Sequence, residues 1–288
     1  MSQATHHMTD APHPLHKRHP RSFRKNKFVY PVPSETALIT GASSGIGLEL
    51  AKVFAEGGSH VVLVARRKST LERLATELRG QFPIDVRVIG KDLTEPHAPQ
   101  SLFDQLQSEK CTVDVLVNSA GFGTVGPLAE LDLDRQLDCV QVNVTALTHL
   151  VRLFLPGMIE RARGGLLNVA STAAFQAGPN MAVYFATKAY VLSLTEAIAE
   201  ETRGTGVRVS CLCPGPTATG FAKNARMAHT RLFRMGTMGA TSVARAGYRG
   251  FRRNKTIVIP GVFNKILSRS ASVVPRSLAR QIAKLLTS

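Results

Sequence analysis

The sequence predicts a single α/β domain, built as a doubly wound parallel sheet with helices on both faces. Short apolar runs alternate with longer amphipathic segments from Ser34 onward, which is typical of βαβ units. The apolar runs are read as buried strands, as expected where helices cover both faces of a parallel sheet. A glycine-rich turn, TGASSGIG at 40–47, follows the first run directly and opens a helical segment. Together these observations favour one large domain in a chain of 288 residues.

The predicted strands and helices alternate along the chain. The domain is expected over residues 34–260, after a tail at 1–33 and before a C-terminal helical extension at 261–288. Buried strands are predicted at 36–40, 60–65, 86–90, 113–118, 165–171, 207–213 and 255–260. Helices are predicted at 46–57, 69–80, 97–108, 134–162, 183–203 and 240–253.

The two ends of the chain differ from the domain between them. Residues 1–33 are rich in Pro, His, Lys and Arg without hydrophobic periodicity, which predicts a flexible basic tail whose five histidines are solvated. The extension predicts a basic amphipathic helix over about 262–286, divided by Pro275. Docking on the sheet or on another subunit is favoured over a helix lying on a membrane. The predicted apolar face comprises Ile266, Leu267, Val273, Val274, Leu278, Ile282, Leu285 and Leu286.

The net charge of +16 comes from the ends rather than from the middle. Residues 1–33 carry +5 and residues 34–201 carry −5, whereas residues 202–288 contain sixteen Lys and Arg and no acid. Such asymmetry suggests an anionic partner. No nucleic-acid motif accompanies it, so nucleic-acid binding is not expected. An anionic substrate, an acidic carrier protein and an anionic membrane surface all remain open.

Several protein classes are disfavoured by what the sequence lacks. No apolar run reaches the roughly 18 residues of a membrane span, and the basic N-terminus has no apolar core of a secretory signal. The four cysteines, Cys111, Cys139, Cys211 and Cys213, suggest neither a disulfide framework nor a metal site. We therefore expect no metal and a cytoplasmic location, with attachment to a membrane surface left open.

The glycine-rich turn has the composition of a phosphate-binding loop. Gly41, Gly45 and Gly47 allow a tight turn and the close approach of a ligand. The helix that follows offers free N–H groups and a positive dipole end to a pyrophosphate. The sequence therefore predicts a dinucleotide site, although the spacing is G-x-x-x-G-x-G rather than G-x-G-x-x-G.

The end of the second strand indicates which dinucleotide binds. A site for NAD usually carries an acid there, which binds the ribose hydroxyls. Here the strand ends in Arg66, Arg67 and Lys68, and Arg binds a 2′-phosphate through paired hydrogen bonds. NADP(H) is therefore the expected cofactor, and the alternative is a solvated basic helix start.

Tyr184 and Lys188, in AVYFATKAY at 182–190, share one face of a predicted helix. A packed Tyr with a surface Lys is the commoner interpretation of such a pair. An ammonium within about 4–6 Å would instead lower the phenol pKa, by on the order of 1–3 units, and create an acid usable near neutral pH.

The chain resembles the short-chain dehydrogenase/reductase (SDR) family over about residues 34–260. The matching motifs are TGASSGIG, Asp92-Leu93, NSAG at 118–121, Asn143, Ser171, YFATK at 184–188 and PGPTAT at 214–219. Each is weak alone, but their order and spacing are specific. The resemblance implies a Rossmann fold and an NADP-dependent oxidoreductase that interconverts a carbonyl and a secondary alcohol. By the same analogy it implies a homo-oligomer.

The resemblance also gives each matching residue a role. Tyr184 would be the general acid that protonates the carbonyl oxygen, and Ser171 would hydrogen-bond that oxygen. Lys188 would lower the Tyr184 pKa and hold the nicotinamide ribose, whereas Asn143 would anchor a water of a proton relay. Little consequence is expected from Ser119, which stands where the family usually has a second Asn. The implied cofactor-binding residues are Gly41, Ser43, Ser44, Gly45, Ile46, Gly47, Arg66, Arg67, Asp92, Leu93, Asn118, Ala120, Gly121, Tyr184, Lys188, Pro214, Gly215, Thr217 and Thr219.

The segment after PGPTAT bears on the substrate. Residues 220–240 interleave Phe and Met with Lys and Arg, which fits a mobile lid over a hydrophobic carbonyl with an anionic handle, such as a fatty acyl thioester. Core packing with solvated charges is an equal alternative. The terminal stretch resembles, more loosely, the 3-oxoacyl and acyl reductase subgroup, so a role in lipid metabolism is expected.

Two other functions stay open at this point. One is a non-catalytic protein that senses NADP(H) or acts as a scaffold, and the other is a protein that acts through its basic ends on a membrane surface or a nucleic acid. The four intact residues of the implied catalytic set favour the enzyme over the sensor. They are Asn143, Ser171, Tyr184 and Lys188.

Overall fold

The computed structural model describes residues 35–219, 236–273, 277, 280–281 and 283–284. The predicted tail at 1–33 and most of the predicted lid at 220–240 lie outside these residues. All the elements below belong to the unit formed by residues 31–288.

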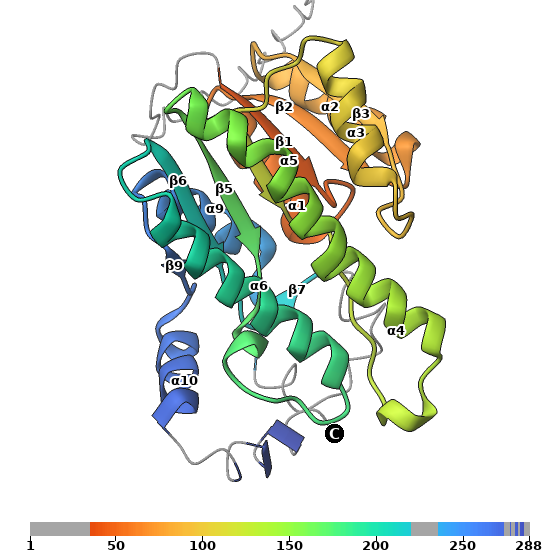
Figure 1. The fold of residues 1–288 in the computed structure, drawn as a ribbon, viewed down its shortest axis with the longest axis vertical. Helices are drawn as coiled ribbons and strands as arrows, with labels where there is room; N and C mark the ends of the chain where they lie inside the picture. Colours follow the sequence, from red (N-terminus) through yellow and green to blue (C-terminus); the bar gives the residue numbers. More distant parts are fainter. Residues whose placement is uncertain (1–34, 220–235, 274–276, 278–279, 282, 285–288) are drawn as a thin grey trace, which may run out of the picture. The chain divides into compact units, whose positions relative to one another are not determined.

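A seven-stranded sheet forms the centre of the fold, with the strand order β3-β2-β1-β4-β5-β6-β9 (Figure 1). Every neighbouring pair in this sheet is parallel. The order reverses between β1 and β4, and ligands of such sheets bind at the carboxyl ends of the strands near this point. The strands are β1 (Thr36–Thr40), β2 (His60–Ala65), β3 (Val86–Gly90), β4 (Val115–Asn118), β5 (Gly164–Val169), β6 (Val207–Leu212) and β9 (Ile257–Val258).

Helices cover both faces of the sheet, as predicted. On one face α1 (Gly45–Glu56), α2 (Lys68–Gln81) and α9 (Ala240–Arg252) share a core with Ala37 and Ile39 of β1. On the other face α3 (Ala98–Ser108), α5 (Leu147–Glu160) and α6 (Ala182–Glu201) pack around Leu38. Because successive residues of a strand point to opposite faces, one strand supplies both cores. The doubly wound α/β fold is therefore confirmed.

The helix predicted at 134–162 is wrong in detail. The structure has α4 (Leu133–Val140), then a π-helical segment, η2 (Gln141–Ala146), and then α5, which together form one long rod (Figure 1). Hydrophobic periodicity does not reveal one widened turn, so the sequence predicted a regular helix. The difference matters for the candidate site, because the widened turn carries Asn143.

By length and composition alone, the rod Leu133–Glu160 could cross a membrane, with 44% of its most apolar window buried. The sequence had suggested no such segment, because charged residues interrupt the run. A core helix of a globular domain meets the same criteria, and α5 contributes Leu150 and Phe154 to the core.

Several strand boundaries also differ from the prediction. The strand expected at 165–171 ends at Val169, and the strand expected at 255–260 is reduced to β9. A separate two-stranded pair was not predicted: β7 (Thr217–Ala218) pairs with β8 (Met238–Gly239), which lies in the predicted lid. The C-terminal helix α10 is described over Val262–Val273, within the predicted 262–286, and the rest of that prediction lies largely outside the described residues.

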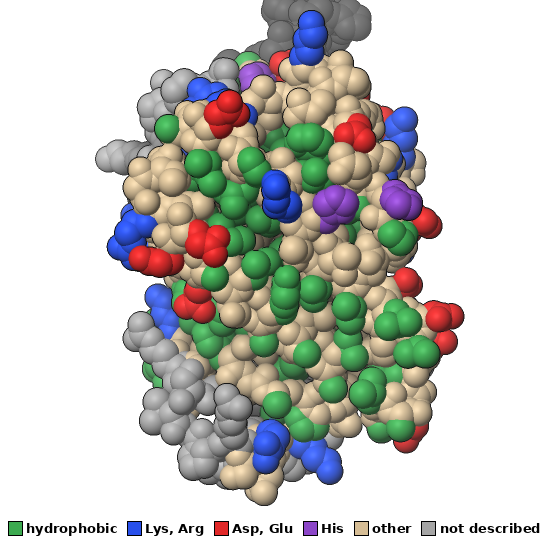
Figure 2. Space-filling view, viewed as in Figure 1, with side chains coloured by type: hydrophobic (Ala, Val, Ile, Leu, Met, Phe, Trp, Pro, Cys, Tyr) green, Lys and Arg blue, Asp and Glu red, His purple; other side chains and the backbone are tan. Residues whose placement is uncertain are grey.

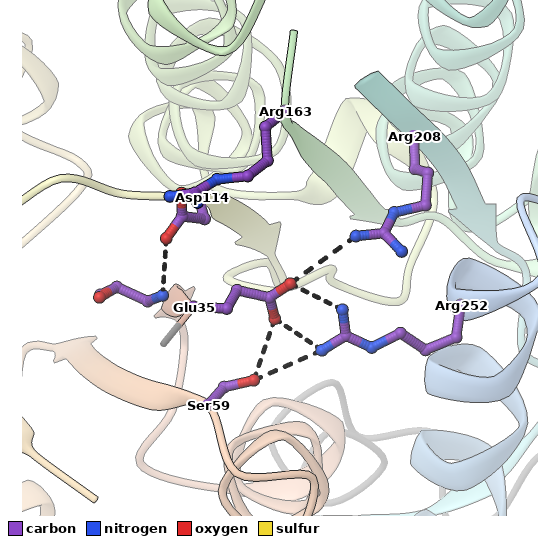
Figure 3. Close-up of polar contacts among 7 residues, drawn as sticks. Glu35, Ser59, Asp114, Arg163, Arg208 and Arg252 are labelled. Carbon is purple, nitrogen blue, oxygen red and sulfur yellow. Dashed lines mark hydrogen bonds and ion pairs between the residues drawn. The ribbon is translucent and has the colours of Figure 1, made fainter. Parts of the chain in front are cut away.

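The amino-terminal edge of the sheet holds a network of buried charges (Figure 3). Glu35, just before β1, is 5% exposed and accepts two hydrogen bonds from Arg252 at the end of α9, of 2.7 and 2.6 Å. Ser59 and Arg208 also contact Glu35. Nothing in the sequence pattern predicted this cluster, because its members lie up to 217 residues apart.

Candidate active site

A cavity of about 460 Å³ opens at the carboxyl edge of the sheet. Residues that follow β1 to β6 line it, together with side chains from α6 and α10. Of the predicted site residues, only Asn118 and Asn143 lie outside this lining. The structure therefore gathers motifs spread over 179 residues, from Gly41 to Thr219, around one cavity.

The glycine-rich turn after β1 forms part of the cavity wall. Gly41 and Gly45 have φ of +70° and +58°, a region that side chains disfavour. A Cβ on Gly41 would lie 2.9 Å from the backbone of Ala120, and one on Gly47 would collide with the Gly41 carbonyl oxygen. Ser44 begins α1 without a capping side-chain hydrogen bond, so the first N–H groups of the helix remain available to an anion. The turn therefore fits a dinucleotide pyrophosphate.

Three charged residues lie beside this turn, at the ends of β2 and β3. The guanidinium of Arg67 lies 3.4 Å from Ser43 Oγ within the turn itself. Arg66 approaches Asp92 at 3.9 Å while its side chain stays 63% exposed. Asp92 also accepts hydrogen bonds from Thr94. The two arginines can therefore reach a phosphate on the adenosine ribose without leaving a buried partner behind.

Thr40, at the end of β1, closes the turn that follows β4. Its Oγ1 accepts hydrogen bonds of 3.0 Å from the backbone N–H groups of Ser119 and Ala120. Because Ser119 contributes its backbone here, the replacement of the family's usual Asn leaves this closure unchanged. Asn118 donates to Asn168 below, at 2.9 Å. Asn118 thus lies outside the cavity lining.

Tyr184 and Ser171 meet on the wall of the same cavity. Ser171 follows β5 and caps the short helix η3 (Thr172–Phe175), where its Oγ accepts from Ala173 N. Burial raises the pKa of Tyr184 to about 12, and a hydrogen bond to Ser171 only partly opposes this. The prediction of a lowered phenol pKa is therefore wrong for the protein alone, since desolvation of the phenolate dominates.

Lys188 lies one helical turn from Tyr184 on α6 and is 6% exposed. Its ammonium donates to Val169 O at 2.8 Å and lies 5.8 Å from the centre of the Tyr184 ring. Burial lowers the pKa of Lys188 to about 8. No carboxylate pairs with it among the described residues. Lys188 is therefore a buried cation without a counter-ion, next to the phenol.

Asn143, in the widened turn η2, binds the loop that follows β4. Its Nδ2 donates to Phe122 O at 2.9 Å and to Thr187 Oγ1 at 3.0 Å, while its Oδ1 accepts from Phe122 N. A Cβ on Gly121 would lie 2.9 Å from Asn143 Oδ1 and 3.4 Å from Lys188 Nζ. The absence of a side chain at Gly121 therefore leaves room for both the Asn143 and Lys188 side chains. The water relay implied for Asn143 stays a prediction.

The sequence did not single out several residues on the cavity wall. Gly123 lies against the Tyr184 ring, and the Arg135 guanidinium stacks on Phe122 at 3.9 Å. Gly123 and Arg135 come after the NSAG motif in the sequence. Their contacts depend on the loop after β4, which has no hydrophobic periodicity from which to predict them. The other unpredicted wall residues include Gln176, Met181, Phe185, Leu267 and Ser268.

Fold and site together define an α/β dinucleotide-binding protein with a Ser–Tyr–Lys constellation in the same cavity as its phosphate-binding turn. The family model described as short chain dehydrogenase matches residues 35–230. The chain belongs to the short-chain dehydrogenase/reductase family.

Relatives with named activities include 1-deoxy-11-beta-hydroxypentalenate dehydrogenase of Streptomyces exfoliatus. It is 39% identical over 189 residues, which cover 65% of this chain and 68% of that protein. The very-long-chain 3-oxoacyl-CoA reductase of Homo sapiens is 31% identical over 201 residues, or 68% of this chain and 63% of that one. The chain thus spans just under two thirds of the reductase.

Solved structures of similar fold include complexes with both nicotinamide dinucleotides. A short-chain dehydrogenase from Sphingobium yanoikuyae in complex with NADPH has a TM-score of 0.74 and 29% identity, covering 83% of this chain and 94% of that one. An enzyme from Burkholderia phymatum in complex with NAD has a TM-score of 0.76 and 28% identity, covering 88% and 97%.

Proposed function

We propose that this protein is an NADP(H)-dependent oxidoreductase that interconverts a carbonyl and a secondary alcohol on an apolar substrate. The observation that carries the proposal is one continuous cavity lined both by the phosphate-binding turn and by Ser171, Tyr184 and Lys188. A nicotinamide dinucleotide held in this cavity would supply the hydride. The residues of the chain would bind the cofactor and substrate and supply the proton.

The protonation states of the site suit reduction of a carbonyl. With a pKa of about 12, Tyr184 is protonated at neutral pH and can give its proton to a substrate oxygen. With a pKa of about 8, Lys188 is mostly a cation at pH 7, so it stabilises negative charge that develops at Tyr184. Ser171 already hydrogen-bonds Tyr184, which places it to bind the same oxygen.

The preference for NADP(H) rests on Arg66 and Arg67. Both line the cavity beside the glycine-rich turn, and no acid stands at the end of β2 where NAD sites usually carry one. Guanidinium groups bind a 2′-phosphate through charge-assisted hydrogen bonds. Since Asp92 holds Arg66 only weakly, at 3.9 Å, the cofactor can recruit this side chain.

The substrate is proposed to be a hydrophobic ketone or acyl thioester. Ala173, Met181, Phe185 and Leu267 give the wall near Tyr184 an apolar character. The relatives whose names describe a 3-oxoacyl-CoA reductase and a pentalenate dehydrogenase support this class. A role in lipid metabolism follows from the same proposal.

A homo-oligomer in the cytoplasm is proposed as the working state. Hydrophobic side chains gather over α4, α5 and α6 (Figure 2), where Leu133, Leu137 and Tyr190 are 68%, 56% and 39% exposed. A second copy would remove this apolar surface from water. The four cysteines are free thiols, as a reducing compartment would keep them. Attachment of the basic ends to a membrane surface stays open.

Tyr184→Phe tests the proposed function. The exchange removes the proton donor and keeps the ring, so NADPH-dependent ketone reduction should fall about 10³-fold. NADPH affinity, measured by fluorescence titration, should change less than about 3-fold. Residual turnover near the native rate would overturn the assignment of Tyr184. Tight NADPH binding without turnover of any ketone by the native protein would instead support a sensing protein.

A further inference from the structure

The C-terminal helix α10 forms part of the cavity wall. Leu267 and Ser268 both border the cavity, and α10 packs against η3, the short helix that Ser171 caps. One turn earlier, Asn264 donates to Pro260 O at 2.8 Å and lies against Gly215, where an added Cβ would collide with the Asn264 amide. Because these contacts fix α10, its cavity-facing side chains have defined positions.

Ser268 differs from Ser270, on the same helix, in the contacts of its hydroxyl group. It is only 3% exposed, and its Oγ has no hydrogen-bond partner within the described part of the chain. Ser270, two residues further on, instead donates to Leu267 O at 2.9 Å. Burying a hydroxyl without a partner destabilises a fold. A buried, unpartnered hydroxyl that borders the cavity therefore points to a ligand group that forms a hydrogen bond with it.

The surroundings of Ser268 limit what that group is. Apart from Lys188, the side chains that border the cavity from η3, the start of α6 and α10 are uncharged: Ala173, Met181, Phe185 and Leu267 are apolar, whereas Thr172, Tyr184 and Ser268 carry hydroxyl groups. Four of the five cations in the lining, Arg66, Arg67, Lys91 and Arg135, come from other elements. A neutral oxygen on an apolar body fits this wall better than a carboxylate or a phosphate, which would be desolvated without a counter-charge.

We propose that Ser268 is a specificity residue that hydrogen-bonds a second, neutral oxygen of an apolar ketone, remote from the carbonyl that Tyr184 protonates. This inference rests on the proposed function. It predicts that the enzyme prefers oxygenated ketones over plain hydrocarbon ketones of the same size. A site that hydrogen-bonds a substrate oxygen discriminates against the analogue without it, because the protein group is left unpaired.

The test compares Ser268→Ala with the native enzyme on three ketones with NADPH. The reference is 4-phenylbutan-2-one, and the oxygenated probes are 4-(4-hydroxyphenyl)butan-2-one and 4-(3-hydroxyphenyl)butan-2-one. We expect kcat/KM to fall about 10-fold for at least one hydroxylated ketone, mainly through KM, and to change less than about 2-fold for the reference. Ser268→Cys, which keeps the shape but donates weakly, should lie between.

Two further readouts separate recognition from a structural role. The melting temperature of Ser268→Ala without ligands should be equal to or above the native value, because the substitution removes an unsatisfied hydroxyl. Ser270→Ala, on the same helix, is the matched control and should leave the selectivity between the ketones unchanged. The affinity for NADPH should also be unchanged in Ser268→Ala.

The outcomes distinguish this inference from the proposed function. Equal losses on all three ketones, unchanged selectivity, or a weakened NADPH affinity in Ser268→Ala would overturn the role of Ser268 alone. Absence of turnover by the native enzyme on every ketone would overturn the proposed function and this inference with it.

Discussion

The two edges of the parallel sheet each bury a basic side chain, but they treat its charge in opposite ways. At the amino edge, the Arg252 side chain is 3% exposed and Glu35 pairs with it through two hydrogen bonds. At the carboxyl edge, Lys188 is 6% exposed and donates a hydrogen bond to the Val169 carbonyl, with no carboxylate partner among the described residues. Both side chains are largely removed from water, and they differ in their partners.

The pKa shifts of the two cations follow from this difference. Burial alone would lower the pKa of Arg252, but the hydrogen bonds and charge of Glu35 raise it. Burial lowers the pKa of Lys188 to about 8 because no carboxylate compensates. A paired buried charge thus belongs to the scaffold, whereas an unpaired one is kept at the expense of stability. We infer that the charge of Lys188 is retained for chemistry.

Breaking the pair at the amino edge should have the largest effect on stability. Arg252→Met leaves Glu35 buried with only Ser59 and the more distant Arg208, so unfolding free energy should fall by about 3–5 kcal/mol. Urea denaturation measures it. Arg253→Met, the exposed neighbour, is the control and should cost less than about 0.5 kcal/mol.

A double variant sharpens this first prediction. The double variant Glu35→Leu with Arg252→Met removes both charges, so no unpaired carboxylate stays buried. It should therefore recover most of the stability that Arg252→Met loses. Native-like stability in Arg252→Met alone would show that the Glu35–Arg252 pair contributes nothing to stability. It would also contradict the proposed difference between the two edges of the sheet.

Removing the charge at the carboxyl edge should have the opposite sign. Lys188 has a pKa of about 8 in the folded protein against 10.5 for an ordinary lysine, so the unfolded state binds more protons between these values. The buried charge of Lys188 therefore destabilises the native protein fully below pH 8, and this destabilisation disappears as the pH rises to 10.5. Lys188→Met should stabilise by up to about 3 kcal/mol at pH 7, less the lost hydrogen bond to Val169 O.

The stability gain of Lys188→Met should also shrink between pH 8 and 10.5, and the variant should lose ketone reduction. Urea denaturation at pH 7, 9 and 10.5 checks the first, and NADPH oxidation checks the second. Tyr184 titrates at about 12, so its ionisation affects both proteins alike in this window. A variant that is less stable at every pH would show that Lys188 is structural.

The contrast between the edges also explains what the sequence could predict. The carboxyl-edge residues stand at the ends of strands inside short motifs, so the resemblance identified Ser171, Tyr184 and Lys188 before any contact was known. Parallel strands then bring these ends together. The amino-edge pair has no local signal, because Glu35 and Arg252 lie 217 residues apart. The wall residue Ser268 escaped prediction for the same reason.

The electrostatics of the site were predicted less well than its positions. Spacing placed Tyr184 and Lys188 on one face of a helix, but it does not report burial. Desolvation raises the pKa of Tyr184, whereas the charge of Lys188 alone had suggested that it falls. The widened turn that carries Asn143 was missed because a helix of regular period and one with a single π turn have nearly the same pattern of apolar residues.

The exposed cations beside the phosphate-binding turn should show an effect on cofactor choice rather than on stability. Arg66→Gln with Arg67→Gln removes the groups proposed to bind the 2′-phosphate, so KM for NADPH should rise about 10- to 100-fold while KM for NADH changes less than about 3-fold. Arg73→Gln, an exposed arginine of α2, is the control. Equal changes for both cofactors would contradict the preference for NADP(H).

The smallest effect is expected from the second ion pair of the amino edge. Arg163 donates to Asp114 at 2.9 Å, with side-chain exposures of 62% and 5%. Since Arg163 is solvated and Asp114 keeps its hydrogen bond from Thr36 N, Arg163→Ala should cost only about 1 kcal/mol. Urea denaturation of Arg163→Ala and Arg252→Met in parallel measures the difference in their unfolding free energies. A loss as large as that of Arg252→Met would show that burial of the acid alone sets the strength of these pairs, whereas a small loss assigns it to burial of both partners.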